Sequence, residues 1–408
     1  MKCGLLGRKL GHSYSPQIHR HFGDYSYSLF EREPDELETF LKQGDFTGIN
    51  VTIPYKKAVI PYLDAISPAA GKVGAVNTIV RKADGTLYGH NTDLYGFSSM
   101  VCRSRLDVAG KKVLVLGSGG ASNTAVSVLN DLGAMVTVIS RSGENNYENL
   151  HLHPDARLIV NCTPVGMYPN NSDSPIDLCQ FPNLEGVLDL IYNPARTQLL
   201  QQAESRGLVA ENGLWMLVAQ AKEAAELFTG CRISDDTIAQ IHKKLSSRMQ
   251  NIILIGMPGS GKTTIGKLLA EKTGRTFVDT DEAIVRAAGR SIPDIFHTDG
   301  ETGFRQWETQ VLKELCGQSA LVIATGGGCV TQPCNYPLLH QNGRIIWIRR
   351  ETAALPTEGR PLSQGADLAA MYQLRKPMYE RFSDFAFANN STPEITADAI
   401  LSRLEETI

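Results

Sequence analysis

Two short apolar runs, each followed directly by a glycine-rich turn, restrict the fold of this chain more than any other feature. The runs are residues 111–116 and 251–255, and the turns begin at Gly117 and Gly256. Continuous β-branched runs are typical of buried parallel strands, and a glycine turn lets such a strand pass directly into a helix. Further strand candidates alternate with helical patterns at 135–139, 158–160 and 187–190, and at 277–278, 321–324 and 344–348. This alternation predicts two α/β units with parallel sheets.

A third region, residues 1 to about 100, has strand candidates of its own at 3–6, 27–30 and 49–53. We expect the main domain boundary in the stretch 243–250, because it is short, polar and precedes a new strand.

The composition is that of a globular protein and argues against several classes. The 408 residues are 42% hydrophobic and 20% charged, and the net charge is −3. A protein whose main partner is a nucleic acid would be more basic, and no apolar run approaches the ~20 residues that a membrane span needs. The sequence reaches Arg8 and Lys9 too early for the apolar core of a signal peptide. Eight cysteines without a CxxC pair are expected to be reduced, mostly buried thiols of a cytoplasmic protein.

The second glycine turn fits the pattern GxxxxGK[ST] of a phosphate-binding loop. Its backbone N–H groups would surround phosphate oxygens, Lys262 would reach the β- and γ-phosphates, and the Thr263 hydroxyl would bind Mg²⁺. The nucleotide-binding candidates are Gly259, Ser260, Gly261, Lys262, Thr263 and Thr264.

Two acids, Asp279 and Asp281, follow at the end of the next expected strand. They lie one alternation apart, so we expect both carboxylates to point the same way. Asp279 would then hold Mg²⁺ through water while Asp281 faces an acceptor hydroxyl.

Residues 251–408 resemble shikimate kinase throughout, with FVDTD, SIPDIF, GExxFR, a GGG turn, RPL and RKPMY in the order of that family. The resemblance implies ATP-dependent phosphorylation of the shikimate 3-hydroxyl. Arg305 and Arg375 would hold the shikimate carboxylate, because guanidinium groups pair with it bidentately. Arg360 would lie in a lid and, with Lys262 and Mg²⁺, neutralise the transferred phosphoryl group. The shikimate-binding set that the resemblance implies is Asp281, Arg305, Gly327, Gly328 and Arg375.

The first glycine turn has the strand and helix context of a dinucleotide site, and its candidates are Gly117, Ser118, Gly119, Gly120 and Ala121. An NAD site has an acid at the end of the following strand, for the ribose 2′-hydroxyl. Here that position reads Ser140-Arg141-Ser142, and Arg141 suits a 2′-phosphate instead. The turn therefore favours NADP(H).

Several polar turns precede this unit. Ser13 and Ser15 lie in HSYSP, and a strand-like alternation would project Asn50, Thr52 and perhaps Lys56 toward one side. The turns GAVNT and NTD add Asn77 and Asp93.

Together these turns resemble shikimate dehydrogenase over residues 1 to about 247, with HSxSP, NVTxPxK, GAVNT, NTDxxG, GxGGAS, NPxxT and NGxxMLxxQA in family order. The resemblance implies that Lys56 and Asp93 form the catalytic pair and that Tyr192 flanks the nicotinamide. A lysine can protonate the oxygen of a reduced ketone, or stabilise its charge, while the aspartate orients it. The substrate-binding set would be Ser13, Ser15, Asn50, Thr52, Asn77, Gln220 and Tyr192.

The two resemblances imply a bifunctional enzyme that reduces 3-dehydroshikimate with NADPH and then phosphorylates shikimate with ATP and Mg²⁺. Its α/β fold would have a substrate-binding lobe over 1–100 and 213–247, a Rossmann-like lobe over 101–212, and a P-loop kinase domain with a parallel sheet over 250–408. One alternative is a quinate/shikimate dehydrogenase fused to another small-molecule kinase, and another is a non-catalytic, ligand-sensing regulator. The oligomeric state is left open by the sequence.

Overall fold

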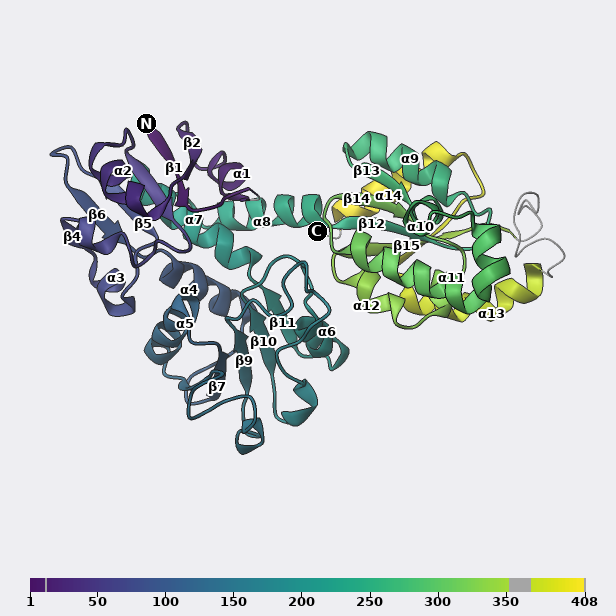
Figure 1. Cartoon of the computed structure of the whole chain (residues 1–408), viewed down its shortest axis with the longest axis horizontal. Helices are drawn as coiled ribbons and strands as arrows, with labels where there is room; N and C mark the ends of the chain where they lie inside the picture. Colours follow the sequence, from purple (N-terminus) through teal and green to yellow (C-terminus); the bar gives the residue numbers. More distant parts are fainter. Residues whose placement is uncertain (12, 352–367, 407–408) are drawn as a thin grey trace. The chain divides into compact units, whose positions relative to one another are not determined.

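The computed structural model describes residues 1–11, 13–351 and 368–406 and divides into two compact units (Figure 1). The first unit comprises Met1–Val165, Ser174–Tyr192 and Gln202–Lys244. The second comprises Gly166–Asp173, Asn193–Gln201 and Leu245–Ile408. In the part of the chain so described, no helix is long and apolar enough to cross a membrane.

The first unit begins with a mixed sheet of six strands in the order β2-β1-β3-β5-β6-β4. β1 pairs with β2 and β3 in parallel, whereas β5 is antiparallel to both β3 and β6. The strands are β1 (Lys2–Gly7), β2 (Ser26–Glu31), β3 (Gly48–Val51), β4 (Ala65–Ile66), β5 (Thr78–Arg81) and β6 (Leu87–His90). The helices along this part are α1 (Ser15–His19), α2 (Leu37–Gln43) and α3 (Pro68–Val73). The later helix α7 (Leu214–Thr229) packs on α1, β3 and β5.

The expected strand at 49–53 is wrong at its C-terminal end, because β3 stops at Val51. Pro54 follows a cis peptide bond with Ile53, and a proline offers no N–H to extend a ladder. The chain turns here, so strand alternation does not explain where Thr52 and Lys56 point.

The second sheet of this unit is fully parallel, in the order β11-β10-β9-β7-β8. Its strands are β7 (Lys112–Leu116), β8 (Met135–Ile139), β9 (Leu158–Asn161), β10 (Gly186–Asp189) and β11 (Val209–Asn212). The helices α4 (Asp93–Ser104), α5 (Gly120–Asp131) and α6 (Gln198–Ser205) belong to this stretch of chain. The strand order reverses between β7 and β9, and ligands of open α/β sheets bind at such a point.

The expected polar boundary at 243–250 is largely helical, because α8 runs over Asp236–Met249. Ile238, Ile241, Leu245 and Met249 are all buried at a spacing of three or four residues. That spacing marks one apolar face of a helix among polar residues.

The second unit contains a parallel sheet in the order β13-β14-β12-β15-β16. The strands are β12 (Asn251–Ile255), β13 (Thr276–Asp279), β14 (Leu321–Ala324), β15 (Gly343–Arg349) and β16 (Phe385–Ala388). The helices are α9 (Lys262–Thr273), α10 (Thr280–Ala288), α11 (Ile292–Cys316, interrupted at Gly300), α12 (Asn335–His340), α13 (Leu368–Phe382) and α14 (Pro393–Glu406). Helices α9 and α14 cover one face, and α11, α12 and α13 cover the other (Figure 1).

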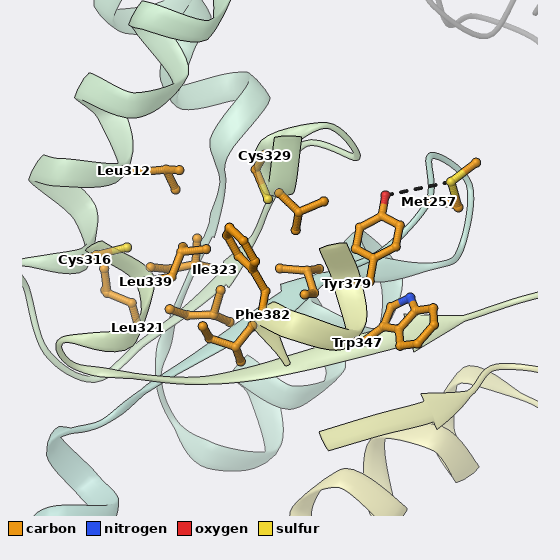
Figure 2. Packing of buried hydrophobic residues seen from close by; sticks show 14 residues of the cluster. Met257, Leu312, Cys316, Leu321, Ile323, Cys329, Leu339, Trp347, Tyr379 and Phe382 are labelled. Carbon is orange, nitrogen blue, oxygen red and sulfur yellow. Dashed lines mark hydrogen bonds between the residues drawn. The ribbon is translucent and has the colours of Figure 1, made fainter. Parts of the chain in front are cut away.

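Alternate residues of β12 explain this layering, since Ile253 and Ile255 enter one core while Ile252 and Leu254 enter the other. Figure 2 shows the first core, in which Tyr379 of α13 lies beside Trp347 with its hydroxyl directed at Met257 in the phosphate-binding loop. The core that holds α13 therefore also contacts that loop.

The expectation of mostly buried cysteines is wrong for half of them. The exposed thiols are Cys102, Cys179, Cys231 and Cys334.

Candidate active sites

The reactive pair of the first unit is Lys56 with Asp93, whose Nζ and Oδ2 atoms lie 2.7 Å apart. Asp93 is the first residue of α4, and its backbone N–H donates to the Asn91 side chain at 3.1 Å. The Lys56 side chain is 32% exposed and that of Asp93 15%. The ammonium is thus oriented by one carboxylate and keeps a water-accessible side from which it can donate to a ligand oxygen.

A buried hydrogen-bond network presents the expected polar contacts beside this pair. Asn50 Nδ2 donates to Thr78 Oγ1 at 3.1 Å, and Asn77 Nδ2 donates to Thr92 Oγ1 at 3.0 Å. Thr92 in turn donates through its backbone N–H to Asn77 Oδ1 at 2.7 Å. Its hydroxyl also reaches Gln220 Oε1 at 3.4 Å, which joins α7 to the network.

Ser13 and Ser15 lie half-buried at the start of α1, where Ser15 N–H donates to Ser13 Oγ at 3.2 Å. Tyr14, between them, packs edge-on against Tyr192, with ring centroids 6.1 Å apart. Burial raises the pKa of Tyr192, so its phenol stays protonated near neutral pH. The two tyrosines bring the start of α1 to the end of β10.

The glycine turn after β7 fits a dinucleotide phosphate. Gly117 has φ = 103° and donates its N–H to Ile139 O, while a Cβ atom there would lie 3.1 Å from Thr163 Cγ2. Gly119 caps α5, and Cβ atoms at Gly119 or Gly120 would meet nothing within 4 Å. The exposed N-terminus of α5 therefore offers N–H groups and space for an anion. Arg141 is exposed next to this turn.

The phosphate-binding loop of the second unit lines a cavity of about 690 Å³ with Asp279, Asp281 and the glycines after β14. Gly259 and Gly261 take the positive φ values of 81° and 101° that this loop requires. Lys262 Nζ donates to the carbonyls of Gly256 and Met257, each at 2.9 Å.

A donor set for Mg²⁺ lies in the same cavity. Thr263 Oγ1 donates to Asp279 Oδ2 at 3.0 Å, so a hydroxyl and a carboxylate converge on one point. Hard oxygen ligands of this kind suit Mg²⁺, and the residues present fit a bound Mg²⁺ nucleotide.

The expected reason for the joint orientation of Asp279 and Asp281 is wrong. Asp279 ends β13, whereas Asp281 lies in the first turn of α10 and donates its N–H to Asp279 Oδ1 at 3.0 Å. Both carboxylates line the cavity because Asp279 caps the helix that carries Asp281.

The acceptor end of the cavity is basic on two sides. Arg305 is buried and donates to Glu308 at 2.9 Å and to Glu301 at 3.0 Å. Arg375 donates to Gly327 O at 3.3 Å. Burial raises the pKa of Glu308 to about 7, against the opposing charge of Arg305.

Most of the expected kinase residues line one cavity of the second unit. In the first unit, hydrogen bonds join Lys56 to Asp93 and link Asn50, Asn77 and Gln220 through Thr78 and Thr92. Arg360 lies outside the described residues. Sequence reasoning missed Thr78, Thr92 and Glu308, which hold expected ligand contacts in place. Glu308 could have been found because it follows Arg305 by three residues on one helix. Thr78 and Thr92 could have been found because they lie in the motifs GAVNT and NTD.

A second cavity, which shares Arg350 with the first, was also missed. Its lining residues include Arg349, Arg350, Tyr372, Ala388 and Asn390. Arg350 donates to Gly259 O at 3.4 Å. Arg349 ends β15 and Arg350 follows it directly, so this cavity carries two arginines.

Comparisons with known proteins identify relatives of both parts of the chain. Residues 5–79 match the shikimate dehydrogenase substrate binding domain, and residues 258–405 match shikimate kinase. A shikimate dehydrogenase (NADP(+)) from Clostridium perfringens is 38% identical over 267 residues, covering 60% of this chain and 98% of the relative.

Solved structures show the same relationship. Shikimate dehydrogenase 1 from Peptoclostridium difficile is 38% identical with a TM-score of 0.55, covering 60% of this chain and 97% of that one. The Thermus thermophilus shikimate dehydrogenase solved with NADP(H) and shikimate is 31% identical with a TM-score of 0.55, covering 60% and 99%. The chain belongs to the shikimate dehydrogenase family and carries a shikimate kinase domain in its C-terminal part, which makes it a bifunctional enzyme of the shikimate pathway.

Proposed function

We propose that the first unit reduces 3-dehydroshikimate to shikimate and that the second converts shikimate to shikimate 3-phosphate. The product of the first site is then the substrate of the second. The observation that carries the proposal is the Lys56–Asp93 pair at 2.7 Å, set beside a network of amides and hydroxyls in a family of NADP-dependent shikimate dehydrogenases.

In the dehydrogenase site, Lys56 Nζ donates a proton to the ketone oxygen as it becomes a hydroxyl. Asp93 Oδ2 holds the ammonium in place and accepts from the forming hydroxyl. Ser13 and Ser15 bind the carboxylate, and a set of polar side chains binds the ring hydroxyls: Asn50, Thr52, Asn77 and Gln220. NADPH, when bound, supplies the hydride to the carbonyl carbon. Arg141 would pair with its 2′-phosphate.

In the kinase site, Arg305 and Arg375 hold the shikimate carboxylate, and Gly327 and Gly328 let the ring approach the backbone. Asp281 orients the 3-hydroxyl and accepts its proton. ATP with Mg²⁺, when bound, supplies the phosphoryl group. Lys262, whose Nζ contacts two loop carbonyls in this structure, would bind the phosphate oxygens, and Thr263 and Asp279 would hold Mg²⁺.

A coupled assay with 3-dehydroshikimate, NADPH and ATP-Mg²⁺ tests the proposal. We expect NADPH oxidation followed by formation of ADP and a phosphate ester. Lys56→Ala should abolish NADPH oxidation and leave phosphorylation of added shikimate intact, and Lys262→Ala should do the reverse. Loss of both activities from either folded variant would contradict two separate sites.

The alternatives receive less support. The match of residues 258–405 to shikimate kinase favours shikimate over another acceptor for the kinase. A non-catalytic regulator would not need the Lys56–Asp93 pair or the Thr263–Asp279 contact. We place the domain boundary within 243–250, and we propose a cytoplasmic enzyme, because NADPH and ATP are metabolites of that compartment.

A further inference from the structure

Tyr27 on β2 connects the wall of the dehydrogenase site to the interior of its lobe. Its hydroxyl donates to Asn50 Oδ1 at 2.7 Å, although the two residues lie on different strands. Burial raises the pKa of Tyr27 well above its usual value, and a hydrogen bond with Ser15 opposes that shift. The phenol therefore stays protonated and acts as a donor toward Asn50.

The Asn50 side chain is held at both ends. Its oxygen accepts from Tyr27, and one N–H of its amide donates to Thr78 Oγ1 at 3.1 Å. The side-chain amide of an asparagine can flip by 180° and exchange its oxygen with its nitrogen, unless the hydrogen-bond partners distinguish the two atoms. The Tyr27 hydroxyl donates to the oxygen, and the His19 side chain also hydrogen-bonds Asn50 in the sense that raises the pKa of the imidazole, as a donor to that oxygen does. The oxygen is thus occupied from the lobe interior, and the amide nitrogen is the end that can meet a ligand hydroxyl.

His19 fixes the Tyr27 ring in turn. The two rings stack with centroids 4.0 Å apart at an interplanar angle of 13°, and His19 Nδ1 lies 2.7 Å from the Tyr25 hydroxyl. His19 is 1% exposed, and burial lowers its pKa to about 3. A neutral, packed imidazole leaves the Tyr27 ring little freedom to move the hydroxyl away from Asn50.

We propose that Tyr27 is a positioning residue of the dehydrogenase reaction, which sets the amide of Asn50 so that it donates a hydrogen bond to a ring hydroxyl of the substrate. This inference rests on the proposed function, because it takes Asn50 as a substrate contact. Tyr27 lies in the first unit, so kinase activity of the same chain provides an internal measure of folded enzyme.

Tyr27→Phe removes only the hydroxyl and keeps the ring against His19. Loss of one uncharged hydrogen bond corresponds to roughly three- to tenfold in affinity. We expect the KM for shikimate in the dehydrogenase reaction to rise by that factor, with the KM for NADP⁺ and kinase activity unchanged. Tyr88→Phe is a matched control, since Tyr88 lies on β6 of the same sheet and contacts Lys82 through its ring; it should leave all values unchanged.

A double-mutant cycle separates positioning from a general structural role. In an Asn50→Ala background, Tyr27→Phe should raise the KM for shikimate no further. An unchanged KM in the single variant, an equal rise in the KM for NADP⁺, or full additivity with Asn50→Ala would each overturn the inference. Absence of dehydrogenase activity from the wild-type chain would instead refute the proposed function itself.

Discussion

Adding a single methyl group at Gly328 should weaken shikimate binding by the kinase. Gly328 has φ = −102° and ψ = 1°, an allowed conformation with negative φ, so Gly328→Ala does not require a left-handed backbone. The new Cβ atom, however, would lie 2.2 Å from Arg305 Nη2 and 2.6 Å from Nη1. The guanidinium would have to withdraw by more than an ångström to reach an ordinary contact distance.

Arg305 has little freedom to withdraw without loss, because it is buried and bonded to Glu308 at 2.9 Å and Glu301 at 3.0 Å. Displacing it costs at least one charge-assisted hydrogen bond, worth about 1.5–3 kcal/mol. That corresponds to roughly a tenfold to hundredfold fall in kcat/KM for shikimate. The KM for ATP and the dehydrogenase activity should not change.

Steady-state kinetics of the kinase with shikimate varied at saturating ATP measures the effect. In an Arg305→Gln background the methyl group should have no further effect, since the displaced guanidinium is gone. Wild-type kcat/KM in Gly328→Ala, or an equal loss in both backgrounds, would refute the assignment of Arg305 to the substrate carboxylate.

Three further outcomes follow from the geometry. Arg141→Ala should raise the KM for NADPH about tenfold and leave that for NADH nearly unchanged in steady-state assays. Arg141 is exposed, so the free energy of its hydrogen bond to the 2′-phosphate should lie at the lower end of the range for charged groups. Arg350→Ala should raise the KM for ATP several-fold without changing that for shikimate, since Arg350 lines both kinase cavities and contacts the phosphate loop. Burial holds the pKa of His19 near 3 in the folded state. As the pH falls below about 6.5, His19 therefore takes up a proton in the unfolded chain but stays neutral in the folded one. The stability of the first unit should therefore be complete above that pH and fall by about 1.4 kcal/mol per pH unit toward pH 3; denaturant midpoints of dehydrogenase activity at pH 5 and 7 should show a shallower dependence in His19→Phe.

The motifs predicted the fold class and the phosphate-binding loop in advance, for a physical reason. A phosphate-binding loop needs positive φ at fixed positions and a helix N-terminus directly behind it, and only glycine at those positions supplies both. The local sequence therefore predicts the loop conformation at Gly259, Gly261 and Lys262. The pair Lys56 and Asp93 was predictable only through the family resemblance, because the two residues lie 37 positions apart.

The period-two pattern of a strand gave a wrong prediction at the point where the chain changes direction. Asn50, Thr52 and Lys56 read as one face of a strand, yet the strand ends at Val51 and a turn delivers Lys56 to Asp93. A period of two holds only while the ladder continues, and Pro54 interrupts the ladder.

The residues that sequence reasoning missed share one property: they act on other side chains. Thr78, Thr92 and Tyr27 carry no charge, and each satisfies a buried side-chain amide. Thr78 and Thr92 lie inside the motifs GAVNT and NTD, in which only the neighbours Asn77 and Asp93 were predicted to act. A buried amide left without partners costs about 1–3 kcal/mol, so the fold must provide these hydroxyls wherever it buries Asn50 and Asn77. Which residue supplies each hydroxyl depends on which strands are neighbours. The order of strands in the sheet decides this, and local sequence does not. The motifs of this enzyme therefore predict its chemistry, whereas the exact orientation of the side chains depends on contacts between strands.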